Sequence, residues 1–142
     1  MRLSTTMEIL LVEDNPADVV LMQEALFEIK AEAELSVATS GEEALVRLRR
    51  AQALPDLVIL DLNLPGKHGT VVLEEMKGDP TMRHVPVIVL SSSGDQRDVK
   101  AVYDRNGNCF VRKPGEYDEF VEVMDRLEKF WMHTAFLVPH EE

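Results

Sequence analysis

The sequence has 142 residues, of which 45% are hydrophobic and 29% charged, so it predicts one globular domain and excludes a largely disordered chain. Its 26 acidic residues against 15 Lys and Arg give a formal net charge of −11, which disfavours direct binding to nucleic acid or to anionic membranes. No signal peptide and no run of about 18 apolar residues occurs, and Cys109 is the single cysteine, so we expect a cytoplasmic protein without disulfides.

The first predicted elements are a strand, a helix and a second strand. An apolar run at 8–12 predicts a strand, and Asn15 can cap a helix that has Pro16 at its first position. Apolar residues at helical spacing continue this helix to about Ile29. Another apolar run at 35–38 predicts the second strand, so the chain begins as strand, helix, strand.

A second helix, a third strand and a third helix follow. Ser40 with Glu43 three residues later forms a capping box, which predicts a helix beginning there. The run at 57–60 predicts a strand buried on both faces, because its residues are apolar without alternation. The third helix is expected from about 70 to 77 and would end at Gly78.

The last two strand-helix units repeat this pattern. A strand is predicted at 87–90, and Asp95 can cap a helix that stops near 106–107. The last strand is expected at 109–111 and the longest helix at about 118–133. Five such units predict an α/β fold, in which a parallel sheet is covered by helices on both faces.

We expect a single domain across 1–142. Its core would span about 8–133 and leave a short C-terminal tail at 134–142. The sequence contains no internal repeat, low-complexity tract or linker that would divide it into smaller units.

Polar residues follow the ends of four of the predicted strands. Glu13 and Asp14 follow the first strand, Asp61 the third, Ser91 the fourth and Lys113 the fifth. Because parallel strands direct their carboxyl ends to one edge of a sheet, we expect these side chains to meet there. Each residue alone is an ordinary capping or loop residue, so the prediction depends on their coincidence.

The expected cluster needs positive charge. Two unit charges about 4 Å apart repel by about 4 kcal/mol at an effective dielectric of about 20, so closely packed carboxylates favour a bound cation. Oxygen ligands indicate Mg²⁺. The expected metal ligands are Glu13, Asp14, Asp61 and the backbone carbonyl of Asn63. Lys113 adds a fixed positive charge that can meet phosphoryl oxygens.

Asp61 is the expected nucleophile of this cluster. A carboxylate can attack phosphorus and form an aspartyl phosphate when cations neutralise the phosphoryl oxygens. Asp61 lies at the end of the central strand, while Glu13 and Asp14 are better placed to hold the metal. Ser91 can donate its hydroxyl to the phosphoryl group. The residues therefore predict Mg²⁺-dependent phosphorylation of Asp61.

Four segments resemble the receiver domains of bacterial response regulators in order, content and spacing. They are ILLVEDNPAD at 9–18, LVILDLNLPGKHG at 57–69, VPVIVLSSSGD at 85–95 and CFVRKP at 109–114. The resemblance implies a flavodoxin-like, doubly wound sheet of five parallel strands in the order 2-1-3-4-5, with five helices. It also implies phosphoryl transfer to Asp61 from a phosphohistidine of a sensor histidine kinase. Such a domain catalyses its own phosphotransfer and dephosphorylation but is otherwise a signalling domain, not an enzyme.

The resemblance also implies a role for each residue of the cluster. These roles are metal binding for Glu13 and Asp14, phosphate acceptance for Asp61, phosphate binding for Lys113, a switch hydroxyl for Ser91 and an aromatic switch for Phe110. The commonest pattern in the family has Thr at the hydroxyl position and often Tyr at the aromatic position. Ser91 keeps a donor, but Phe110 has no hydroxyl, so a switch through Phe110 would work by packing alone.

Within the family, the chain is similar to single-domain regulators that are associated with bacterial phytochromes. The segments that carry this similarity are NPAD at 15–18, NLPGKHG at 63–69, GDP at 78–80 and EKFW at 128–131. It implies that the sensor histidine kinase is a bacteriophytochrome. Because no DNA-binding domain follows the last helix, we expect output through protein contact or through a downstream phosphotransfer protein.

Apolar residues near the C-terminus exceed what one helix face requires. Phe130 and Trp131 are adjacent, and an apolar stretch follows at 136–138. We therefore expect a homodimer formed through the fifth helix and the tail.

Two other kinds of function remain open from the residues alone. A Mg²⁺-dependent hydrolase forms a similar aspartyl phosphate, but such enzymes have a DxD pattern where this chain has Asp61-Leu62-Asn63. The other alternative is a receiver-shaped binding module that is not phosphorylated, or a flavin-binding protein of the same fold. The retained polar residues argue against lost chemistry, and the acidic first loop would repel a flavin phosphate.

Overall fold

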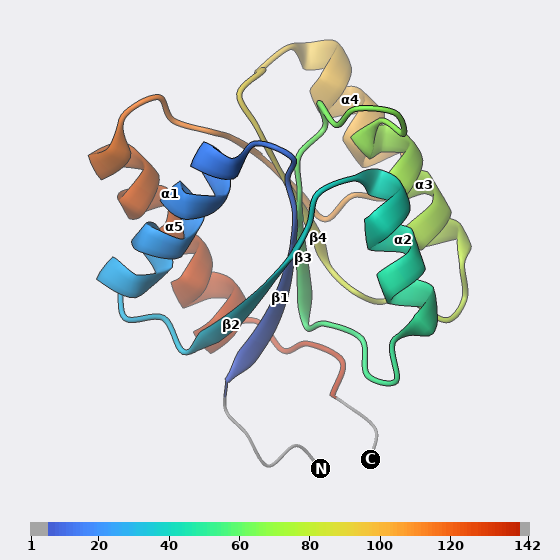
Figure 1. Ribbon diagram of the computed structural model, residues 1–142, viewed down its shortest axis with the longest axis horizontal. Coiled ribbons are helices and arrows are strands. Elements are labelled where there is room, and N and C mark those ends of the chain that lie inside the picture. The colour runs from blue at the N-terminus through green and yellow to red at the C-terminus, as the bar shows by residue number, and fades with distance from the viewer. Residues whose placement is uncertain (1–5, 140–142) are drawn as a thin grey trace.

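The computed structural model describes residues 6–139 as a parallel sheet between two layers of helices (Figure 1). The strands are β1 (Met7–Val12), β2 (Ala33–Ala38), β3 (Leu57–Leu60), β4 (Val87–Ser91) and β5 (Cys109–Arg112). The helices are α1 (Pro16–Glu28), α2 (Gly41–Arg50), α3 (Gly69–Gly78), α4 (Gln96–Asp104) and α5 (Tyr117–His133). All neighbouring strands are parallel, in the order β2-β1-β3-β4-β5, so the predicted fold class and strand order are confirmed.

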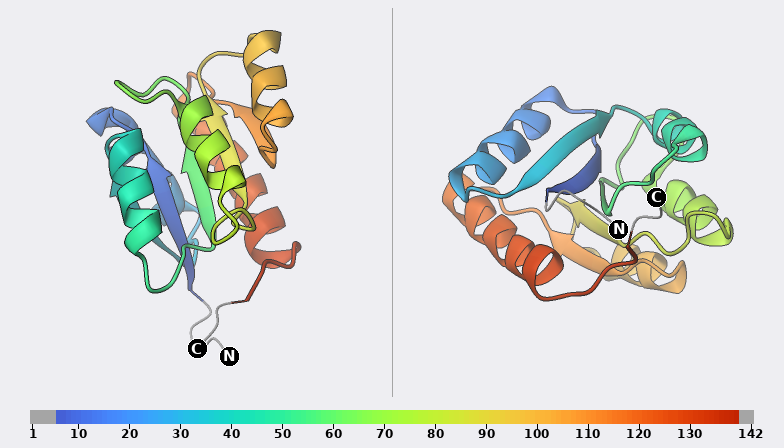
Figure 2. Two further views of the ribbon diagram at one scale, coloured as in Figure 1. Left: turned by 90° about the vertical axis from the view of Figure 1, so that its right-hand side faces the viewer. Right: turned by 90° about the horizontal axis from the view of Figure 1, so that it is seen from below.

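The two faces of the sheet bury separate apolar cores. Helices α1 and α5 cover one face, and α2, α3 and α4 lie on the other (Figures 1 and 2). In β1, Ile9 and Leu11 belong to the α1–α5 core, while Leu10 and Val12 belong to the opposite core. All four side chains are buried, which explains why residues 9–12 form an apolar run without alternation.

Side-chain caps fix the beginnings of the first four helices. Asn15, Ser40 and Asp95 each accept a hydrogen bond from an amide in the first turn of the helix that follows, as predicted. The cap of α3 was not predicted, because it is His68, whose Nδ1 accepts from the Thr70 amide at 3.2 Å. The observed bounds lie within about two residues of those predicted. No helix in the described part of the chain has the length and apolar character needed to cross a membrane.

The tail after α5 crosses the amino-terminal end of the sheet (Figures 1 and 2). Trp131 and Leu137 pack, partly buried, against the α1–α5 core, whereas Phe130 and Phe136 are 52% and 101% exposed. Part of the apolar surplus expected near the C-terminus is therefore covered within the chain. The outer ends of the expected domain, 1–5 and 140–142, lie outside the described residues.

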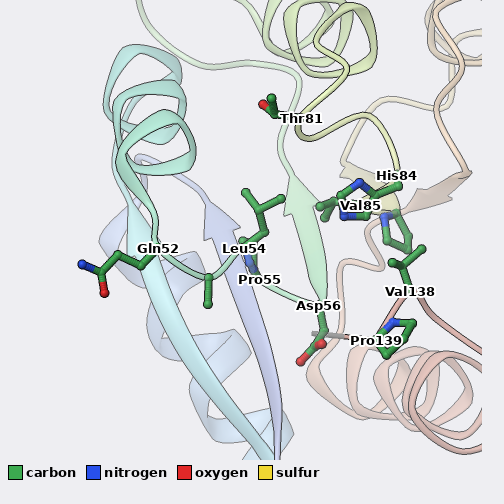
Figure 3. A pocket seen from close by; sticks show the side chains of 11 residues that line it. Gln52, Leu54, Pro55, Asp56, Thr81, His84, Val85, Val138 and Pro139 are labelled. Atoms are coloured by element: carbon green, nitrogen blue, oxygen red, sulfur yellow. The ribbon is translucent and has the colours of Figure 1, made fainter. Parts of the chain in front are cut away.

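A cavity of about 350 Å³ lies at the amino-terminal ends of the strands (Figure 3). Leu54 and Pro55, which precede β3, line it together with His84, and Val138 and Pro139 of the tail line another side. The predicted site lies beyond the carboxyl ends of the strands. The cavity is therefore separate from the chemistry described below.

Candidate functional site

The carboxyl ends of β1 and β3 bring three carboxylates together. Glu13 and Asp14 follow β1, and Asp61 follows β3, which pairs with β1. Each residue offers one ligand oxygen, and these oxygens all lie within 4.8 Å of one another. Glu13 and Asp61 are buried, with 3% and 9% exposed, while Asp14 is open to solvent. Among residues 6–139, no other group of three or more acidic, His or Cys side chains has this spacing.

The backbone after β3 folds closely against Asp61. The Asn63 amide donates to Asp61 Oδ1 at 3.2 Å, which orients the carboxylate. The Gly69 amide donates to the Leu62 carbonyl at 2.9 Å. A Cβ at Gly69 would lie 2.5 Å from the Asp61 carbonyl oxygen, closer than real Cβ contacts allow. Glycine is therefore required where α3 begins, so that the loop can close over the end of β3.

Lys113 reaches the cluster from the end of β5, but its side chain contacts α1. Its Nζ lies 3.2 Å from Asp18 Oδ2 and 3.5 Å from Glu13 Oε2. Its backbone amide donates to the Ser91 carbonyl at 2.7 Å, which fixes where the side chain starts. Throughout the described chain, no ion pair joins Lys113 to Asp61. Asp18 was not predicted, because its pattern is only that of an acid in a first helical turn.

The two residues predicted to act as a switch have other partners in this structure. Ser91 is fully buried, and its hydroxyl accepts from the Ser93 amide at 3.3 Å. Phe110 packs, partly buried, against the core on the α2 side of the sheet. Its amide donates to the Tyr103 hydroxyl of α4 at 3.1 Å. The aromatic ring at 110 thus packs against the core, while its backbone amide is hydrogen-bonded to α4.

Burial and crowding alter the protonation of the cluster. Burial raises the pKa of Glu13 to about 7; Lys113 opposes this change, and the charges of Asp61 and Asp18 add to it. Burial by itself would lower the pKa of Lys113, but the carboxylates of Glu13 and Asp18 outweigh it and hold that pKa above its usual value. The cluster therefore has a lysine that stays charged but too little positive charge for all its carboxylates.

The donor set fits a hard divalent cation. The ligand atoms of Glu13, Asp14 and Asp61 are all carboxylate oxygens, which Mg²⁺ and Mn²⁺ prefer. One side of the cluster is open at Asp14, so water and phosphoryl oxygens could complete the coordination. A cation here would also favour the ionised form of Glu13, whose pKa is raised without one.

Comparison with known proteins identifies a family. The family model described as the response regulator receiver domain matches residues 9–125. The response regulator Rcp1 of Synechocystis sp. is 37% identical over 134 residues, which cover 91% of this chain and 91% of Rcp1. The similarity therefore extends over nearly the whole length of both proteins.

Solved structures agree with this assignment. The phosphorylated cyanobacterial phytochrome response regulator RcpA is 40% identical, with a TM-score of 0.89 over 94% of this chain and 99% of that chain. The Mn²⁺-bound form of Rcp1 is 36% identical, with a TM-score of 0.86 over 94% and 99%. A receiver domain of the Pseudomonas aeruginosa sensor histidine kinase PA1611, with magnesium in its active-site cleft, is 25% identical with a TM-score of 0.73 over 89% and 98%. This chain belongs to the response regulator receiver domain family.

Proposed function

We propose that Asp61 accepts a phosphoryl group from a phosphohistidine of a sensor histidine kinase, in a reaction that requires Mg²⁺. The observation that carries this proposal is the meeting of Asp61 with Glu13 and Asp14 within 4.8 Å, beside the charged Lys113. Asp61 is buried and oriented by the Asn63 amide, whereas Asp14 is exposed and suited to metal binding. The relatives whose structures contain a divalent metal or a phosphoryl group support it.

The chain's own groups would divide the work of the transfer. Glu13, Asp14 and Asp61 would hold Mg²⁺ together with the Asn63 carbonyl, and the bound ion would neutralise phosphoryl oxygens. An Asp61 carboxylate oxygen attacks phosphorus, so that an O–P bond forms while the P–N bond to histidine breaks. The bonding electrons return to the imidazole nitrogen of the kinase. Attack of water on the aspartyl phosphate later returns the free carboxylate and inorganic phosphate.

Lys113 and Ser91 would bind the transferred group. The ammonium of Lys113 is charged and can pair with a phosphoryl oxygen. The Ser91 hydroxyl would turn from its contact with the Ser93 amide and donate to another phosphoryl oxygen. Because Ser91 ends β4 just before α4, this movement would draw the intervening loop toward Asp61. Phe110, packed beside α4, would follow, and α4, β5 and α5 would form the readout face.

The relatives suggest the partner. RcpA is described as a cyanobacterial phytochrome response regulator, and AtBRR, 34% identical with a TM-score of 0.72, as a bacteriophytochrome response regulator. We therefore assign a bacteriophytochrome-type histidine kinase in the cytoplasm as the phosphoryl donor. The net charge of −11 favours output by protein contact or onward phosphotransfer over contact with nucleic acid.

Self-association through α5 and the tail is also part of the proposal. Phe130, Phe136 and Val138 are 52%, 101% and 56% exposed, although all three are large apolar side chains. They follow one another along the end of α5 and the tail, so a second copy would cover them.

Binding of beryllofluoride, which mimics a phosphoryl group on a carboxylate, tests the proposed chemistry. Fluorine NMR is expected to show a bound signal that requires both Mg²⁺ and Asp61, and that disappears in Asp61→Asn. If the wild-type protein gives no bound signal at millimolar Mg²⁺, the binding-module alternative replaces this proposal.

A further inference from the structure

Asp18 lies closer to the Lys113 ammonium than any of the three acids predicted for the site. Its Oδ2 is 3.2 Å from Nζ, compared with 3.5 Å for Glu13 Oε2. The Lys113 side chain is only 13% exposed, so it is held by these contacts and is not free in solvent. The lysine that should bind a phosphoryl group on Asp61 is thus held on α1 while Asp61 is unmodified.

The two acids that hold Lys113 differ in what happens when the lysine leaves. Glu13 is almost completely buried, so it would need another cation, which the proposed metal would supply. Asp18 is 32% exposed and lies in the first turn of α1, where water and the positive end of the helix dipole can stabilise its charge. Asp18 can therefore release Lys113 at low cost once a stronger anion is present.

A phosphoryl group on Asp61 is such an anion. Its oxygens carry more negative charge than one carboxylate, and they would lie beside the metal that Glu13 and Asp14 would hold. The long, flexible stem of lysine allows its ammonium to move between neighbouring partners without a change in the backbone. Its fixed starting point, the amide of Lys113 bonded to the Ser91 carbonyl, keeps both destinations within the same small site.

We propose that Asp18 is a positioning residue that holds Lys113 on α1 in the unphosphorylated protein and competes with the phosphoryl group for it. The inference rests on the proposed phosphorylation of Asp61 and adds a residue that sets how strongly Lys113 pairs with the phosphoryl oxygens. Removing the Asp18 charge frees Lys113 for the phosphoryl group, but it also lets the ammonium approach Asp61 and repel the metal.

The test compares Asp18→Asn with Glu24→Gln. Glu24 is an exposed acid on the same helix, and its replacement makes the same change in charge. Beryllofluoride affinity is measured by fluorine NMR at saturating Mg²⁺, and Mg²⁺ affinity is measured separately by calorimetry. Asp18→Asn is expected to bind beryllofluoride about fivefold more tightly than wild type, the size expected of a part-exposed ion pair, and to bind Mg²⁺ less tightly. Asp18→Glu, which keeps the charge, should restore both affinities toward wild type.

The outcomes separate this inference from the function on which it rests. If wild-type protein binds no beryllofluoride, the proposed phosphorylation fails and the inference fails with it. If wild type binds it but Asp18→Asn behaves like Glu24→Gln, only the role of Asp18 is overturned. A loss of both affinities together with a lower melting temperature would make Asp18 a structural residue and would also overturn the proposal.

Discussion

At the scale of single residues, the sequence predicts which charged residues form the site, but it does not predict which partners their side chains contact. Parallel strands direct their carboxyl ends to one edge of the sheet, so the convergence of Glu13, Asp14 and Asp61 follows from the parallel direction of β1 and β3. Side-chain direction is different, because it depends on neighbours from other elements. Nothing in the sequence indicates that Lys113 bonds Asp18, or that the Ser91 hydroxyl bonds the next turn of its own loop.

The raised pKa of Glu13 predicts an unusual pH dependence of stability without metal. Its pKa is about 7 in the folded protein and 4.5 ordinarily, so the folded state holds the proton more tightly. The contribution of Glu13 protonation to the free energy of unfolding is fully present below about pH 4.5 and is lost as the pH rises through about 7. Between pH 5 and 8, the loss should be on the order of 2 kcal/mol in wild type and absent in Glu13→Gln.

Denaturant unfolding at a series of pH values, in a metal chelator, measures this difference. Millimolar Mg²⁺ should remove most of the loss at high pH, because the cation binds the folded site and favours ionised Glu13. Parallel stability profiles for wild type and Glu13→Gln would show that Glu13 titrates normally and that the cluster is not short of positive charge.

At the scale of elements, local signals predict where helices begin better than what fills each cap. Asn15, Ser40 and Asp95 are common capping residues, and the structure uses all three. His68 rarely has this role, so no propensity indicates it, although it caps α3. The loop that it ends also depends on Gly69, whose close approach to Asp61 becomes visible only when β3 and α3 are placed together.

Lys77 at the end of α3 connects this helix to the loops that precede β4 and β5. Its Nζ donates to the Arg83 and Val85 carbonyls and to Asn108 Oδ1, all at 2.9–3.0 Å. Burial lowers the pKa of Lys77, so the charged form depends on these acceptors. Lys77→Met should lower the free energy of unfolding by about 1–3 kcal/mol, because three acceptors, of which the Val85 carbonyl is part-buried, lose a charged donor.

Chemical denaturation measures this loss against Lys129→Met as the matched control. Lys129 is 70% exposed and pairs with Asp125 one turn away on α5, so its replacement should change stability by less than about 0.5 kcal/mol. Equal effects of the two substitutions would contradict the bridging role of Lys77.

At the scale of the whole molecule, the two ends of the sheet differ in their properties. The carboxyl ends of the strands hold the charged site, while the amino ends meet the tail around a cavity lined largely by apolar residues and prolines (Figure 3). Apolar runs and caps predict five strand-helix units. They do not predict the order of the strands in the sheet, because short buried strands of similar composition fit several positions equally well. Only the resemblance to receiver domains predicts the order 2-1-3-4-5.

Self-association belongs to this scale because it depends on surface that one chain leaves uncovered. The double substitution Phe130→Ser and Phe136→Ser is expected to weaken the dimerisation affinity by at least about tenfold. Analytical ultracentrifugation at micromolar concentration measures this change. Phe27→Ser on α1 is the control, since Phe27 is 86% exposed but lies near Tyr117 at the beginning of α5, not at its end. A wild-type protein that stays monomeric with and without beryllofluoride would contradict the proposed dimer.

Intact-mass measurement after incubation with acetyl phosphate tests the central claim most directly. Wild-type protein should gain one phosphoryl group in the presence of Mg²⁺ and none in a metal chelator, and Asp61→Asn should gain none in either condition. A phosphoryl group that appears without Mg²⁺, or that persists in Asp61→Asn, would contradict the assignment of Asp61 as the metal-dependent acceptor.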